Sequence, residues 1–202
     1  MYSIVPEQHV ILLAVIWLTL GMAHVLLLAT WSSIFRLVIA EVTFGLGPSL
    51  FRWGRLTFRL VPLGGSVRYE VGPDQVARSG QPEQLNMAAL LKRAGAATMP
   101  IATLLAVATI GLGFGAFDYC VAGFRQLWQG AWHPISIAQQ LITDSIGFCA
   151  MSTLVVSYCA AATKFCVLNV LPLPGSSTGW TLDIVLRAAG MSERQLIALR
   201  SL

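Results

Sequence analysis

The chain has 202 residues, of which 56% are hydrophobic and only 11% are charged, and its formal net charge is +4. This composition is too apolar for an ordinary soluble domain and indicates an integral membrane protein.

Three apolar stretches, of which the third includes Lys164, are long enough to cross a membrane, which takes roughly 20 apolar residues as a helix. They predict spans at about 10–32, 94–117 and 145–168. We therefore expect a mainly α-helical membrane protein, with three transmembrane helices in one membrane domain that covers residues 1–202.

The basic residues predict how these helices are oriented. Eight of them lie between the first and second spans: Arg36, Arg52, Arg55, Arg59, Arg68, Arg78, Lys92 and Arg93. The loop at 118–144 has only Arg125. Positive residues mark the cytoplasmic side, so we expect an outer N-terminus, a cytoplasmic 36–93 segment, an external 118–144 loop and a cytoplasmic tail. Topology accounts for the positive charge, and nucleic acid is not an expected partner.

The segment between the first two spans carries a strand pattern. Apolar and polar residues alternate on both sides of "PLGG", 62–65, which predicts a β-hairpin over 55–71. Upstream, "TFGLGPSLF", 43–51, is rich in glycine and proline and indicates a loop or a re-entrant turn. Residues 71–86 are polar and indicate an exposed connector. We expect the 42–71 segment to be cytoplasmic and associated with the membrane.

The external loop contains two tryptophans four residues apart, Trp128 and Trp132. Tryptophan is favoured at the membrane interface, so this stretch predicts a short amphipathic helix on the outer surface. His133 precedes Pro134 and indicates a turn.

Three polar residues are expected at membrane depth: His24, Lys164 and Asn169. Pro172 and Pro174 follow the third span and should break its helix. We interpret His24 as a buried histidine with a hydrogen-bond partner, with gating or proton sensing as the alternative. Lys164 either reaches the cytoplasmic interface or has a functional role within the membrane.

Three motifs together resemble the site-2 protease family of intramembrane zinc metalloproteases. "VTFGLGPSLF", 42–51, starts 18 residues after His24, "VPLGGSV" occupies 61–67, and "NVLPLPGSSTG" occupies 169–179. In the family, the corresponding segments follow an HExxH helix, close a hairpin and supply the last zinc ligand. The resemblance runs from about residue 10 to 185 and implies the family's three-helix core.

The catalytic residues of that family are missing. His24 matches the first histidine of HExxH, but Val25 replaces the glutamate, Leu28 the second histidine and Ser177 the aspartate. A catalytic zinc normally takes three protein ligands, and its general base must reach the bound water. We therefore expect no catalytic residues, no metal and no other cofactor.

The resemblance implies a catalytically inactive homologue that binds other membrane proteins, as a scaffold or subunit of a larger complex in the bacterial inner membrane. An exposed strand edge can accept a peptide by strand addition, and we assign partner or lipid binding to five hairpin residues: Arg55, Phe58, Arg59, Val67 and Tyr69. Two alternatives remain. One is an active protease with relocated zinc ligands, and the other is a transport component that uses His24 and Lys164.

Overall fold

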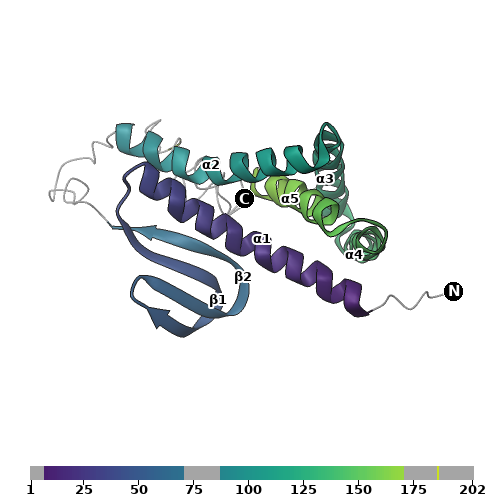
Figure 1. Ribbon diagram of the computed structural model, residues 1–202, viewed down its shortest axis with the longest axis horizontal. Coiled ribbons are helices and arrows are strands. Elements are labelled where there is room, and N and C mark those ends of the chain that lie inside the picture. The colour runs from purple at the N-terminus through teal and green to yellow at the C-terminus, as the bar shows by residue number, and fades with distance from the viewer. Residues whose placement is uncertain (1–6, 71–86, 171–185, 187–202) are drawn as a thin grey trace. The chain divides into compact units, whose positions relative to one another are not determined.

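The computed structural model describes residues 7–70, 87–170 and 186, and the fold is mostly helical with one small sheet (Figure 1). The elements in chain order are α1 (Glu7–Ile34), β1 (Ile39–Trp53), β2 (Leu56–Tyr69), α2 (Met87–Leu112), α3 (Gly115–Trp132), α4 (Pro134–Met151) and α5 (Leu154–Val170).

The chain divides into two compact units. The helical unit contains Met1–Gly21 and Thr103–Leu168, and the sheet unit contains Met22–Ala102 and Asn169–Leu202. The helices α1 and α2 each pass through both units.

Two helices meet the requirements for crossing a membrane by length and composition: α1, and the Leu91–Leu112 part of α2. The 28 residues of α1 extend about 42 Å at the helical rise, which exceeds a hydrocarbon core of about 30 Å. The first predicted span is thus one helix. The second begins earlier than predicted and ends at Leu112, because Gly113 takes a left-handed conformation (φ +59°) that ends α2.

The third predicted span, 145–168, is not one helix, and a third transmembrane helix is not confirmed. The chain leaves α4 at Ser152, whose backbone is extended, and α5 begins at Leu154. The Thr153 hydroxyl accepts the backbone N–H of Val156 at 3.4 Å, which is the capping contact of a helix start. This contact explains the break, and the 17 residues described in α5 form a shorter apolar helix.

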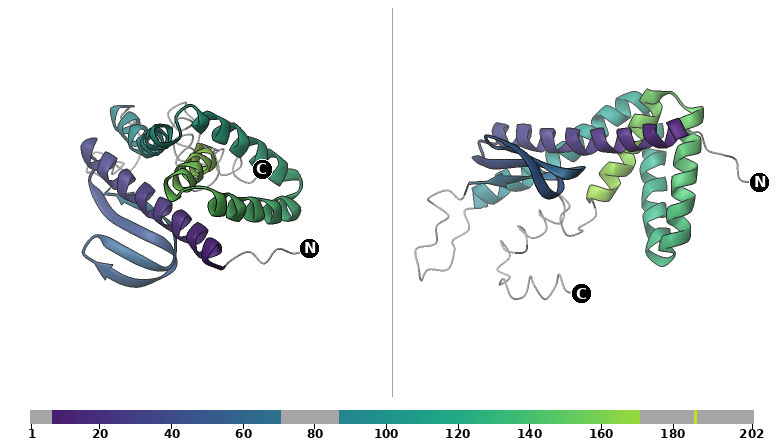
Figure 2. Two further views of the ribbon diagram at one scale, coloured as in Figure 1. Left: turned by 45° about the vertical axis from the view of Figure 1, so that its right-hand side comes forward. Right: turned by 90° about the horizontal axis from the view of Figure 1, so that it is seen from below.

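The predicted external loop is largely helical. It is occupied by α3 and by the first part of α4, which run back along one another from the turn at His133 (Figure 2). His133 ends α3, and Pro134 takes the first position of α4, where its missing N–H costs nothing. The turn was predicted correctly, but the expected single helix is two helices.

The sheet differs from the predicted hairpin in two ways. The segment 43–51, predicted as a loop, lies within β1, and β2 runs through 62–65, where the hairpin turn was expected. The tight turn lies instead at Gly54–Arg55, with Trp53 opposite Leu56. Gly45 bends β1 at φ +91°, and a Cβ there would lie 2.5 Å from the Val61 carbonyl oxygen. The glycines therefore act as bends within strands, not as loop residues.

These bends fold the two strands into four paired segments. Residues 39–44 pair with 65–69, and 49–53 pair with 56–59, both antiparallel. Residues 42–44 also lie opposite 56–58, with the numbering rising on both sides. The segment order is thus 65–69, 39–44, 56–59 and 49–53, which leaves 65–69 and 49–53 as the outer segments.

Candidate functional site

His24, Val25 and Leu28, the positions that the resemblance predicts to correspond to a zinc site, lie on α1, and Ser177 falls outside the described residues. Val25 is 2% exposed and packs with Val42 and Phe44 in the core of the sheet unit. Its side chain therefore serves as packing between the helix and the sheet. Leu28 is partly exposed, and its carbonyl oxygen accepts the Ser32 hydroxyl at 2.6 Å.

Gly65, the last residue of "PLGG", makes the contact between sheet and helix possible. A Cβ at this position would lie 2.2 Å from the Thr43 carbonyl oxygen and 2.8 Å from Cγ2 of Val25. Only a residue without a side chain fits between them. The last glycine of the motif is thus explained by close packing of β2 on β1 and on Val25 of α1.

His24 and Asn169 are both partly buried. The hydroxyl residues 176–178, at the end of the "NVLPLPGSSTG" motif, lie outside the described residues. Within residues 7–70 and 87–170, no group of three or more His, Cys, Asp or Glu side chains is placed to hold a metal ion.

Several polar and charged side chains of the sheet form hydrogen bonds and ion pairs with one another. The Glu41 carboxylate accepts the Thr57 hydroxyl at 2.5 Å and lies 3.8 Å from Arg68. These contacts, with the Thr57 hydrogen bond the largest cause, hold the pKa of Glu41 below its ordinary value. Arg55 pairs with Glu70 at 3.4 Å. These exposed arginines are therefore partly neutralised within the sheet.

Tyr69 ties the end of β2 to two helices. Its hydroxyl lies 2.8 Å from the Ser32 hydroxyl on α1, and the Arg93 guanidinium lies 5.9 Å from its ring centre. Burial raises the pKa of Tyr69 above its ordinary value. This side chain is engaged within the protein, so the predicted role of Tyr69 in partner binding is not supported by its side-chain contacts.

The residues assigned to partner binding do not all lie at an edge of the sheet. Val67 and Tyr69 lie in an outer segment, whereas Phe58 and Arg59 lie in an inner one. Phe58 lies opposite both Phe44 and Phe51, so its segment has neighbours on both sides. Its ring stacks on Phe44 at 5.2 Å. Phe58 therefore does not lie at a free edge, because β1 returns on its far side. The Arg59 guanidinium is exposed and donates to the Gly47 carbonyl oxygen at 3.2 Å.

Val67 lies in the outer segment 65–69, and no described segment pairs with the far side of that segment. The Glu70 N–H donates to the Val38 carbonyl oxygen at 2.8 Å, which fixes its direction toward β1. Successive N–H groups of a strand alternate in direction. The N–H group of Val67 therefore points away from β1.

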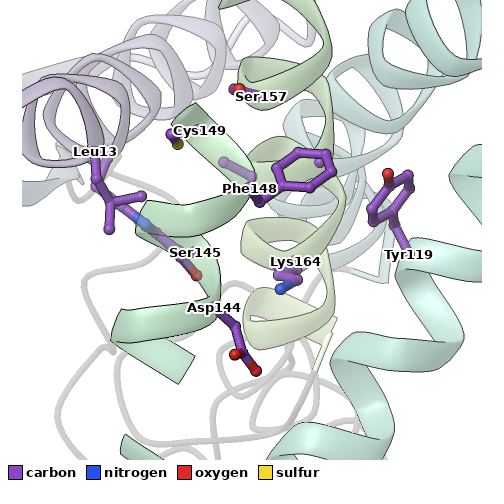
Figure 3. Close-up of a pocket in the computed structure, with 11 residues that line it drawn as sticks. Leu13, Tyr119, Asp144, Ser145, Phe148, Cys149, Ser157 and Lys164 are labelled. Carbon is purple, nitrogen blue, oxygen red and sulfur yellow. The ribbon is translucent and has the colours of Figure 1, made fainter. Parts of the chain in front are cut away.

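Lys164 lies on α5 in the helical unit, where it lines a pocket of about 170 Å³ (Figure 3). His24 belongs to the sheet unit, so the structure defines no joint site for the two residues. Four polar residues of the pocket were not predicted from the sequence: Tyr119, Asp144, Ser145 and Ser157. Serine, two alanines and lysine at 157, 160, 161 and 164 follow a helical face, and this spacing was the signal available.

Compared with known proteins, the chain matches no family model, no curated protein and no solved structure.

Proposed function

We propose that the protein is a catalytically inactive member of the site-2 protease fold that binds another membrane protein, as a scaffold or subunit of a complex. The burial of the Val25 side chain supports this proposal most strongly. The residue at the position of the family's general base is buried against the sheet and has no access to a water nucleophile. Valine also has no group that accepts a proton, so hydrolysis by the family's mechanism has no base.

The binding surface we assign is the outer edge of β2, residues 65–69. Its outer side presents the N–H group of Val67, whose direction follows from the Glu70 hydrogen bond. An extended segment of a partner can add to such an edge through main-chain hydrogen bonds. Unpaired edges are otherwise a liability that proteins cover or blunt, which favours a partner strand there.

The topology belongs to the same proposal. The sheet faces the cytoplasm, the N-terminus lies outside, and the protein sits in a bacterial inner membrane. The eight basic residues between the first two spans support this orientation. The 17 residues of α5 lie at the lower limit for a crossing and are the candidate third transmembrane helix.

The edge is tested with two substitutions at one position. Val67→Pro removes an outward N–H, which an edge strand tolerates, whereas Val67→Ala shortens the side chain and keeps the N–H. Each full-length variant is expressed in the native host, purified in mild detergent, and its co-purifying membrane proteins are quantified against wild type. The proposal expects a partner that is retained by Val67→Ala and lost by Val67→Pro.

Thermal melts of both variants show whether the fold is kept. Equal retention of every partner by the two folded variants would exclude strand addition at this edge.

A further inference from the structure

The pocket of the helical unit holds two opposite charges that do not pair with each other. It is lined by residues of α1, α3, α4 and α5, among them Lys164 and Asp144. No ion pair or hydrogen bond joins these two side chains among the described residues. Figure 3 shows the Lys164 ammonium and the Asp144 carboxylate toward the same end of the pocket. Asp144 lies near enough to act on the charge of Lys164, but the two groups form no direct ion pair, which leaves space for a ligand that contacts both.

A buried hydroxyl marks the other end of the pocket. Ser157 is 2% exposed, and its Oγ has no hydrogen-bond partner. Other helix hydroxyls bond back to the preceding turn, as Thr109 does to the Leu105 carbonyl at 2.8 Å and Thr163 does to the Ala160 carbonyl. Ser157 does not, although it lines the pocket. A buried hydroxyl left without a partner is costly, so a polar group is expected to meet it.

The walls between these ends are apolar and aromatic. Trp17, Tyr119 and Phe148 line the pocket, and the last two rings meet edge to face at 5.8 Å. Aromatic rings beside a carboxylate form the usual surroundings of a bound ammonium group. A lysine ammonium is a common ligand for phosphate. The volume of about 170 Å³ exceeds that of a cavity of about 150 Å³ which binds benzene.

We propose that this pocket binds a phospho-ammonium zwitterion, with its phosphate at Lys164 and its ammonium among Asp144, Trp17 and Tyr119. A simple anion would be repelled by Asp144, and a simple cation by Lys164, whereas a zwitterion satisfies both. The exposed position of Asp144 places the opening at the charged end. This inference is independent of the proposed partner binding, because the edge of β2 lies in the other unit.

Two kinds of molecule carry both a phosphate and an ammonium group: a zwitterionic phospholipid, in its headgroup, and a free phospho-amine. Ser157 distinguishes them, because it lies seven residues from Lys164 on α5, about 10 Å along the helix. That distance is too long for the headgroup alone, but it suits an ester oxygen of a phospholipid. Loss of the Ser157 hydroxyl should therefore weaken binding of the lipid and leave the free headgroup unaffected.

The test is equilibrium dialysis of the full-length protein in non-ionic detergent with three labelled probes. These are dihexanoyl phosphatidylethanolamine, dihexanoyl phosphatidylglycerol, which lacks the ammonium, and O-phosphoethanolamine. In wild type, we expect the phosphatidylethanolamine probe to bind about tenfold tighter than the phosphatidylglycerol probe, the scale of one charge contact. If both phosphatidylethanolamine and O-phosphoethanolamine bind, the ratio of their affinities and the effect of Ser157→Ala on each affinity show which of the two is the ligand.

The variants are Lys164→Met and Asp144→Asn, with Asp118→Asn as the matched control. Asp118 is exposed on α3 and does not line the pocket. Both pocket variants should weaken binding of the phosphatidylethanolamine probe about tenfold, and the control should leave it unchanged.

Asp144→Asn should not weaken binding of the phosphatidylglycerol probe, which has no ammonium to lose. Should Lys164→Met fail to fold, Asp144→Asn and the wild-type probe comparison still decide the question. Equal wild-type affinity for the two lipid probes together with no binding of O-phosphoethanolamine, or unchanged affinity in the folded pocket variants, would overturn the proposal.

Discussion

Replacing Gly65 by alanine should separate β2 from its neighbours and destabilise the sheet unit. The new Cβ would lie 2.2 Å from the Thr43 carbonyl oxygen, 2.8 Å from Val25 Cγ2 and 3.2 Å from the Phe44 Cα. The first contact is with backbone, which yields only if the paired segments 39–44 and 65–69 move apart by about 1 Å. Overpacking costs about 1–3 kcal/mol, and each strained ladder hydrogen bond adds about 1 kcal/mol.

We therefore expect a loss of about 3 kcal/mol in the free energy of unfolding, which lowers Tm by about 6–12 °C in a chain of this size. The assay is a tryptophan-fluorescence melt in detergent. Gly64→Ala is the matched control, because a Cβ there meets nothing within 4 Å and only the left-handed backbone (φ +67°) opposes it. Its cost should be about 1 kcal/mol.

Adding Val25→Ala to Gly65→Ala should restore only part of the loss, since the contact with the Thr43 carbonyl remains. Equal melting temperatures for the Gly64 and Gly65 variants would refute the packing argument.

Three further predictions concern the sheet and its placement. The depressed pKa of Glu41 means that its stabilisation is complete above its ordinary pKa of 4.5 and is lost as pH falls through the lower folded-state value; melts from pH 7 to 3 should therefore fall more steeply for wild type than for Glu41→Gln. A double-mutant cycle of Ser32→Ala and Tyr69→Phe should give a coupling energy of about 1 kcal/mol in the same melts, and additive effects would show that their 2.8 Å contact contributes nothing. A cysteine at Gln75, on a background without native cysteines, should react with an impermeant thiol reagent only from the cytoplasmic side, and labelling from outside would exclude the proposed topology.

The first helix could be predicted from sequence because one long, continuous stretch of uncharged residues indicates it. Residues 8–35 have no charge, and one helix covers Glu7–Ile34. The break between α4 and α5 could not be found by counting apolar residues, because it depends on a hydroxyl cap at Thr153 within a stretch that remains apolar overall. The Ser152–Thr153 pair is the only local trace of that cap in the sequence.

The sheet shows a different limit of sequence patterns. The glycines of 43–51 and of "PLGG" look like turn residues, because glycine is the usual residue of turns. In the fold they serve close approach: Gly45 to the Val61 carbonyl, and Gly65 to Thr43 and Val25. Those contacts join residues far apart in sequence, so the pattern could not distinguish a bend within a strand from a turn between strands.

The residue types at 25 and 28 show directly that neither side chain can bind a metal, and the structure adds that Val25 is buried. The pocket needs Asp144 of α4 to approach Lys164 of α5. The two residues approach each other because the chain turns between α4 and α5. The predicted single span, 145–168, had no turn there.

The zinc content of the purified protein tests the central claim most directly. The full-length chain is purified without chelators, incubated with excess zinc, separated from free metal and measured by inductively coupled plasma mass spectrometry beside His24→Ala. Because Val25 and Leu28 cannot act as ligands, we expect far less than one zinc per chain and the same value in both proteins. About one zinc per chain in wild type, lost in His24→Ala, would show a working metal site and contradict the account.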